Sequence, residues 1–186
     1  MRIIGGKYRG LRLATLRGDK LRPTSDQLRE TLFDVLGGTI ENTRFLDLYA
    51  GTGAVGLEAL SRGALETVFV ERHRPAAEII QHNLAALKIR SGFCVMACAV
   101  LPGLERLASQ GERFNFVFLD PPYAEFREYH HALRQLGRPG VLTGSSLVIA
   151  EHSRQTLLEE GYGNLRRTRT IRHGDAQLSF FRLAAL

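Results

Sequence analysis

The sequence predicts an α/β fold in which helices alternate with the strands of a mostly parallel sheet. From Phe45 onward, apolar strand-like runs alternate with helical segments, and this alternation is typical of right-handed βαβ units. Gly51, Gly53 and Gly56 stand at the spacing G-x-G-x-x-G directly after one such run, which predicts a tight strand-to-helix turn. With 186 residues, the chain has room for one sizeable core and not for a second full domain.

The first 22 residues are predicted to form a small basic β-hairpin outside the main sheet, and residues 23–186 the main domain. The extended segments 2–4 and 11–13 flank a glycine-rich stretch. The formal net charge is +6, and the first 22 residues account for all of it, because they hold seven Lys and Arg against one Asp. This concentration indicates a segment that contacts phosphates, with a solvated basic tail as the alternative. The candidate contact residues are Arg2, Lys7, Arg9, Arg12 and Arg22.

The other elements follow from apolar periodicity and from end signals. A helix is expected from about residue 26, with Thr24 as N-cap, Gln27 completing a capping box and Gly37-Gly38 ending it. The last two strands are joined by a short turn without a helix, which indicates an antiparallel hairpin. The expected strands are 45–49, 67–70, 92–97, 114–119, 146–150, 164–170 and 177–182, and further helices are expected from about 54, 75, 101, 125 and 153.

Three carboxylates are expected around the glycine turn. Asp47, Glu71 and Asp120 each stand at the end of a predicted strand. Glu71 follows the first glycine by about 20 residues, where an acid can bind ribose hydroxyls, so we expect a nucleoside cofactor. Carboxylates repel a pyrophosphate and attract a sulfonium or an ammonium, which favours S-adenosylmethionine over NAD. A turn that binds no ligand is the alternative.

Asp120-Pro121-Pro122-Tyr123 is the most specific motif of the sequence and follows the apolar strand 114–119. The prolines restrict the backbone, so that the Asp120 carboxylate and nearby carbonyls are held as hydrogen-bond acceptors, while Tyr123 offers a flat face. Two acceptors and a stacking surface suit an exocyclic amino group on a planar base. A rigid turn that leaves a strand is the alternative, but it explains only the prolines.

These motifs resemble those of known enzymes. Residues 47–56 resemble the cofactor loop of S-adenosylmethionine-dependent methyltransferases, and residues 120–123 match the signature of those that methylate amino nitrogens of nucleobases. The segments 2–6, 22–24 and 57–63 are further similar to the bacterial RsmD family, which methylates guanine N2 in 16S rRNA. The similarity runs from Arg2 to about Glu151.

The resemblance implies a Rossmann-like, seven-stranded class I methyltransferase sheet whose last strand is antiparallel. It implies S-adenosyl-L-methionine as cofactor, no metal, and 16S rRNA as partner, within a small ribosomal subunit or an assembly intermediate. Many members carry an acid near the end of the third strand, but Ala97-Cys98-Ala99 has none, so backbone atoms there are expected to contact the adenine. The implied catalytic residues are Asp120, Pro121, Pro122 and Tyr123, and the implied cofactor-binding residues are Asp47, Tyr49, Ala50, Gly51, Thr52, Gly53, Gly56, Glu71, Arg72, Cys98, Ala99 and Asp120.

Two other functions stay open from the sequence alone. The same Asp-Pro-Pro-Tyr motif serves methyltransferases that act on adenine N6 in DNA, although the chain has no room for a separate target-recognition domain. A nucleic-acid-binding module that kept the fold without activity is the second alternative. The presence of Asp47, Glu71, Asp120 and Tyr123 argues against it.

We expect a cytoplasmic monomer. Hydrophobic residues make up 44% of the chain, no apolar run approaches the roughly 20 residues that span a bilayer, and the basic N-terminus lacks the apolar stretch of a signal peptide. Cys94 and Cys98 are too few for a zinc site and are predicted to be reduced thiols in the core.

Overall fold

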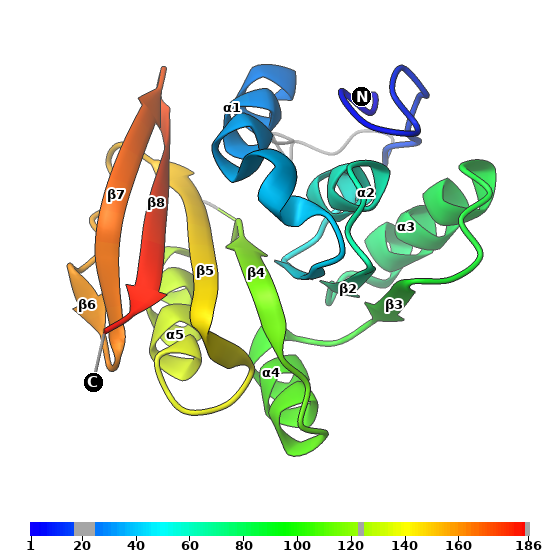
Figure 1. The fold of residues 1–186 in the computed structure, drawn as a ribbon. Helices are drawn as coiled ribbons and strands as arrows, with labels where there is room; N and C mark the ends of the chain where they lie inside the picture. Colours follow the sequence, from blue (N-terminus) through cyan, green and yellow to red (C-terminus); the bar gives the residue numbers. More distant parts are fainter. Residues whose placement is uncertain (17–24, 123–124, 185–186) are drawn as a thin grey trace.

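The structure, a computed structural model, confirms the predicted α/β fold and describes residues 1–16, 25–122 and 125–184. Helices and strands alternate along the chain up to the last three strands, which follow one another directly (Figure 1). The elements are α1 (Asp26–Leu36), η1 (Gly37–Ile40), β1 (Arg44–Leu48), α2 (Ala54–Ser61), β2 (Glu66–Val70), α3 (Arg74–Ala86), β3 (Phe93–Met96), α4 (Val100–Ser109), β4 (Phe114–Leu119), α5 (Phe126–Leu136), β5 (Leu142–Ser153), β6 (Gly161–Tyr162), β7 (Leu165–His173) and β8 (Ala176–Leu183).

The described strands form one sheet in the order β3-β2-β1-β4-β5-β8-β7-β6. The five strands β1 to β5 are parallel, whereas β8 runs antiparallel to both β5 and β7. The antiparallel last strand is therefore confirmed. The sheet has eight strands and not the seven that the resemblance implied, because the two-residue β6 adds an edge beyond β7.

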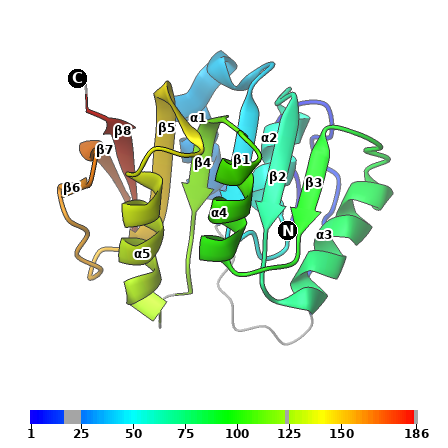
Figure 2. The same cartoon turned by 90° about the horizontal axis from the view of Figure 1, so that it is seen from below.

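Helices cover both faces of the parallel part of the sheet (Figure 2). Side chains alternate along each strand, so Leu46 and Leu48 of β1 pack with α4 and α5, whereas Phe45 packs with α1 and α2 on the other face. Helix α3 joins that second face, where Ile80 packs against Phe69 and Leu57. By the same alternation, Asp47 lies on the face of α1 and α2, between the two leucines that point to the opposite face.

The predicted N-terminal hairpin is present outside the sheet as a single antiparallel bridge between Arg2 and Arg12. Ile3 and Leu13 are buried and join the cluster formed by α2, α3 and Phe69. The segment is thus held to the domain by apolar contacts and is not a separate tail.

One local prediction at an element end was wrong, and another concerns a residue outside the described ranges. No helix begins at Ser153, because β5 continues to that residue and the Ser153 hydroxyl and carbonyl then accept hydrogen bonds from the Thr156 amide, which closes a turn. The proposed N-cap Thr24 lies outside the described residues. The observed N-cap of α1 is Ser25, whose Oγ accepts from the Leu28 amide at 3.1 Å.

The two cysteines are free thiols, as predicted, but they are not in the core. Cys94 is exposed and Cys98 is half-buried, because β3 is an edge strand of the sheet with an incompletely covered surface. Partial burial still raises the pKa of both thiols, which makes them poor nucleophiles. Among the described residues, no helix combines the length and the apolar character needed to cross a membrane.

We predict that Gly56→Ala destabilises the protein by about 1 to 3 kcal/mol through overpacking. A methyl group there would lie 2.3 Å from the Phe69 ring and 2.8 Å from Thr67 Cγ2, with no room for α2 to approach β2. Urea denaturation measures the effect. Gly38→Ala is the matched control, since nothing lies within 4 Å of its added methyl, and its change should stay within about 0.5 kcal/mol. Equal stability of the two variants would contradict the packing role of Gly56.

Candidate active site

The predicted site residues meet at the carboxyl ends of β1, β2, β4 and β5, where the strand order reverses between β1 and β4. In open α/β sheets, ligands bind at this edge. Leu48 pairs with Leu119, and Leu119 pairs with Ala150, so Asp120 and Glu151, the next residues of their strands, lie side by side. Both project on the same face as Asp47, because the residues before them pack on the opposite face with α4 and α5.

The glycine turn is built around the buried Asp47 carboxylate. Asp47 Oδ2 accepts a hydrogen bond from the Gly56 amide at 2.8 Å, which fixes the first turn of α2 against β1. Gly51 and Gly53 have φ of 54° and 78°, a conformation that favours glycine. A Cβ at Gly51 would meet nothing within 4 Å, so the backbone of the turn is open to a ligand at that point.

Glu71 connects the end of β2 to the glycine turn. Its Oε2 accepts from the Gly51 amide at 2.8 Å and its Oε1 from the His73 amide at 2.7 Å. A carboxylate offers about four lone-pair positions, so both oxygens keep capacity for further donors. Neighbouring Arg72 is half-exposed and forms an ion pair with Glu125.

The Asp-Pro-Pro segment leaves β4 beside this turn. Asp120 is partly accessible. The Pro121 carbonyl lies 3.3 Å from the hydroxyl of Tyr129, a fully buried residue of α5. The same hydroxyl lies 2.9 Å from the Glu151 carbonyl. The Pro122 carbonyl accepts from the Glu125 amide at 2.8 Å. Tyr123 lies outside the described residues.

Two carboxyl groups of the site, Asp47 and Asp120, have a raised pKa. Burial raises the pKa of Asp47 to about 7, the Gly56 amide opposes the shift and Glu71 adds to it. Burial also raises the pKa of Asp120 well above its usual range, and the nearby Glu151 and Asp47 carboxylates raise it further. Each shift means that the charged form is disfavoured. A cation placed beside these groups would favour their charged forms.

Two polar contacts connect the glycine-turn side of the site to α5. Tyr49, whose φ is 58°, directs its hydroxyl to Glu128 at a distance of 3.0 Å. Burial and the Glu128 charge raise the pKa of this hydroxyl. The Arg72–Glu125 ion pair makes a second connection. Together these contacts place the start of α5 next to the residues predicted to bind the cofactor.

The other predicted cofactor-binding residues lie around the same edge. Ala50 donates to the Val70 carbonyl and accepts from Gly53, and the Thr52 carbonyl accepts from buried Asn83. Half-buried Cys98 and exposed Ala99 follow β3, and Ala99 is the N-cap of α4.

Sequence reasoning missed Glu151, Glu125, Glu128 and Tyr129. Glu151 could have been found, because it follows a predicted strand just as Asp120 does. The others lie on or before α5 and carry no signal in the sequence that points to the site. They are brought there by the packing of α5 on the sheet.

The predicted phosphate-contacting residues lie on the N-terminal loop, which is fixed to α2. Fully buried Glu58 accepts hydrogen bonds from the Ile4 and Gly5 amides at 2.8 and 2.7 Å. Ser61 accepts from the Tyr8 amide and donates to the Gly5 carbonyl. Arg22 lies outside the described residues, and the exposed members of the group are Arg2, Lys7, Arg9 and Arg12.

The family of the chain follows from comparison with known proteins. A family model described as Conserved hypothetical protein 95 matches residues 1–182. The chain belongs to this family. YlbH of Bacillus subtilis, a putative rRNA methyltransferase by name, is 34% identical over 174 residues, which cover 94% of each chain. Ribosomal RNA small subunit methyltransferase D of Escherichia coli is 42% identical over 123 residues, 66% of this chain and 60% of the relative. Among solved structures, yhhF of Escherichia coli has a TM-score of 0.87 at 31% identity and covers 100% and 99% of the two chains.

We predict that the raised pKa of Asp47 makes stability depend on pH. Its folded pKa is about 7 against an ordinary 3.8, so between these values the native state holds a proton that the unfolded chain has lost. The free energy of unfolding should therefore fall as the pH rises through this window, by up to about 1.4 kcal/mol per pH unit from this group.

The test compares urea unfolding of the wild type and of Asp47→Asn, which cannot titrate, at pH 5 and pH 7.5. The wild type should lose stability relative to the variant as the pH rises. Asp34→Asn, at an exposed position of α1, is the control and should follow the wild type. If the free energy of unfolding changed equally in the wild type and in Asp47→Asn between the two pH values, the pKa of Asp47 would not be raised in the folded protein.

Proposed function

We propose that this protein transfers a methyl group from S-adenosylmethionine to the exocyclic N2 amino group of a guanine in the RNA of the small ribosomal subunit. The observation that carries the proposal is the position of Asp120 and the Pro121 carbonyl beside the glycine turn, at the edge of the sheet where the Asp47 and Glu151 carboxylates also gather. The name of the Escherichia coli relative supports the RNA class. The choice of guanine N2 rests on the resemblance of the sequence motifs to the RsmD family.

The residues present fit the cofactor. The open backbone at Gly51 would admit a nucleoside, and Glu71, with free acceptor capacity on both oxygens, would bind the ribose hydroxyls. The desolvated carboxylates of Asp47 and Asp120 would attract the sulfonium and the ammonium. When bound, the cofactor supplies an electrophilic methyl group. Residues at the end of β3, Cys98 and Ala99, would border the adenine.

The chain's own task is to orient the nucleophile. The lone pair of the guanine N2 amino group is delocalised into the ring, so it must be localised and aimed before it can react. The Asp120 carboxylate and the Pro121 carbonyl would accept its two hydrogens and favour a tetrahedral nitrogen. Preorganised acceptors of this kind often contribute more to catalysis than any other effect. Tyr123 would stack on the base, and Pro122 would stiffen the segment between them.

Buried Tyr129 would lie against the Pro121 carbonyl and limit its movement. Its hydroxyl has one proton and lies nearer to the Glu151 carbonyl than to the Pro121 carbonyl, at 2.9 against 3.3 Å. The weaker contact leaves the Pro121 carbonyl free to accept a stronger bond from the substrate. Burial of Tyr129 then limits how far the segment can move.

The N-terminal loop would supply RNA affinity. Residues 1–22 form the RNA-contacting extension of the domain 23–186 in this proposal. Lys7, Arg9 and Arg12 are exposed, and the backbone that carries them is fixed to α2 by Glu58 and Ser61. An RNA substrate within a small subunit or an assembly intermediate would place a monomeric enzyme in the cytoplasm.

We predict that Asp120→Ala lowers the methylation rate by about 100-fold or more, because removing one preorganised contact costs about that much. Affinity for the cofactor, measured by calorimetry, should change much less, as expected for an interaction made in the transition state. The assay offers cofactor labelled in the methyl group together with small ribosomal subunits, free RNA or DNA, and maps the labelled base. Asp34→Ala, at an exposed position of α1, is the control.

Three outcomes would contradict the proposal. Label on adenine N6 of DNA would favour the alternative enzyme. Binding of nucleic acid without transfer to any substrate would favour the binding module. Methylation by Asp120→Ala within a factor of about 10 of the wild type would show that Asp120 is not the orienting acceptor.

We predict that replacing Lys7, Arg9 and Arg12 by Ala weakens RNA binding and leaves cofactor affinity unchanged. The slope of log affinity against log salt should become shallower by about 0.7 to 0.9 for each phosphate that the variant no longer binds. Arg2 is kept, because it pairs with Asp26 at 3.6 Å. The control replaces Arg90, Arg113 and Arg138, which are exposed elsewhere on the chain. Equal slopes for the two triple variants would identify the loop as a solvated basic tail.

A further inference from the structure

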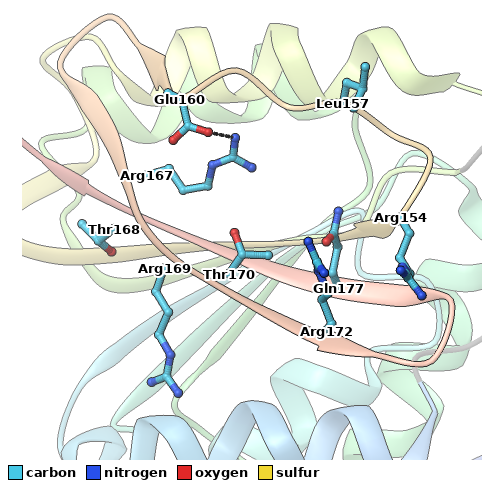
Figure 3. Close-up of a pocket in the computed structure, with 9 residues that line it drawn as sticks. All are labelled: Arg154, Leu157, Glu160, Arg167, Thr168, Arg169, Thr170, Arg172 and Gln177. Atoms are coloured by element: carbon cyan, nitrogen blue, oxygen red, sulfur yellow. Dashed lines mark hydrogen bonds and ion pairs between the residues drawn. The ribbon is translucent and has the colours of Figure 1, made fainter.

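A groove of about 780 Å³ lies beside the C-terminal hairpin, away from the predicted site residues. It is bordered by β7, by the start of β8 and by the turn region that follows β5 (Figure 3). Its lining is mostly hydrogen-bond donors, and it contains one acid. The lining residues are Arg154, Leu157, Glu160, Arg167, Thr168, Arg169, Thr170, Arg172 and Gln177.

The arginines of the groove divide into two kinds. Arg167 is largely buried, and Glu160 neutralises it in an ion pair. Arg154, Arg169 and Arg172 are exposed, and within the described ranges no carboxylate lies at ion-pair distance from any of the three. Asp175, three residues after Arg172, contacts Arg154 through its backbone carbonyl, which accepts from the Arg154 amide. The groove therefore carries uncompensated positive charge.

Two of these arginines, Arg154 and Arg172, lie together at the end of the hairpin that faces the active-site edge. Figure 3 shows Arg154, Arg172 and Gln177 close together, while Arg169 points away from them. Gln177 pairs with Arg172 on one side and with His152, the neighbour of Glu151, on the other. Since β7 runs in the same direction as β4 and β5, its carboxyl end with Arg172 lies at the edge that carries Asp120.

This edge also leads to the N-terminal loop. The His173 side chain at the hairpin turn lies 3.3 Å from the Gln27 side chain at the start of α1. Arg29 of the same helix donates to the Arg2 carbonyl at 2.8 Å. In Figure 1 the β7–β8 turn, α1 and the N-terminal loop follow one another along the top of the molecule. Basic side chains thus border the active-site edge from two sides of α1.

We propose that the groove binds backbone phosphates of the RNA substrate through Arg154 and Arg172, with Gln177 and Thr170 as additional donors; this rests on the proposed function. Guanidinium groups suit phosphate oxygens because their donors match them in pairs. Leu157, 85% exposed at the rim, offers apolar surface to a base or a ribose. With the N-terminal loop on the other side of α1, the RNA is held at two points while one nucleotide enters the site between them.

The test measures binding of a fluorescein-labelled, single-stranded RNA of about 20 nucleotides by anisotropy at several KCl concentrations. Arg154→Ala/Arg172→Ala should bind about tenfold more weakly at 50 mM salt, with a salt slope shallower by about 1.4 to 1.8 because two phosphates are no longer bound. Arg154→Lys/Arg172→Lys keeps both charges and should retain most of the slope. Arg90→Ala/Arg113→Ala removes the same charge from exposed positions near the amino ends of β3 and β4 and should bind like the wild type. Thermal denaturation checks that all variants fold.

The outcomes separate this inference from the proposed function. If the wild type binds the RNA but methylates nothing, a shallower slope for the Ala double variant still supports the groove. If the double variant binds and methylates RNA like the wild type, the inference is overturned and the proposed function stands. A defect on assembled small subunits with unchanged affinity for the RNA would mean that the groove contacts a ribosomal protein, and it would also overturn the proposal.

Discussion

The hydrogen bond between the Gly56 amide and the buried Asp47 carboxylate is the contact on which the site depends. It joins the end of β1 to the first turn of α2, and the absence of a side chain at Gly56 lets the helix lie against Phe69 and Thr67. The position of α2 then fixes the glycine turn at one end of the helix. At the other end, the same helix presents Glu58 and Ser61 to the N-terminal loop. One short helix thus aligns the predicted cofactor site with the predicted RNA contacts.

The carboxylates at the sheet edge set a second constraint. Asp47, Asp120 and Glu151 share one face because three neighbouring strands end in register. Burial and neighbouring carboxylates raise the pKa of Asp47 and of Asp120. This arrangement suits a positively charged ligand, which would favour the charged forms of both groups. The polar contacts of Tyr49 and Arg72 with α5 hold this edge in place.

Much of the fold could be predicted because local signals and tertiary packing agree. The alternation of apolar runs, the glycine turn and the C-terminal hairpin are all present in the structure. The helix expected from Ser153 failed because a strand continued by pairing with β8, a long-range contact that periodicity cannot show. Cys94 was misplaced for a similar reason, since its exposure depends on which strand lies at the sheet edge.

The site could be predicted where a carboxylate stands at the end of a predicted strand, as Asp47, Glu71 and Asp120 do. Tyr129 and Glu128 were not, because only the packing of α5 brings them to the edge. The role of Glu58 could not be predicted, because only the returning N-terminal backbone makes it a buried acceptor.

Burial of Glu58 under the N-terminal loop also determines which truncations of the chain can be interpreted. Deleting the loop would remove the Ile4 and Gly5 amides that donate to Glu58, together with the buried Ile3 side chain that packs with α2 and α3. The lost hydrogen bonds and the lost apolar burial both lower stability. A shortened protein would therefore lose structure together with RNA affinity, and only surface substitutions on the intact loop can separate the two.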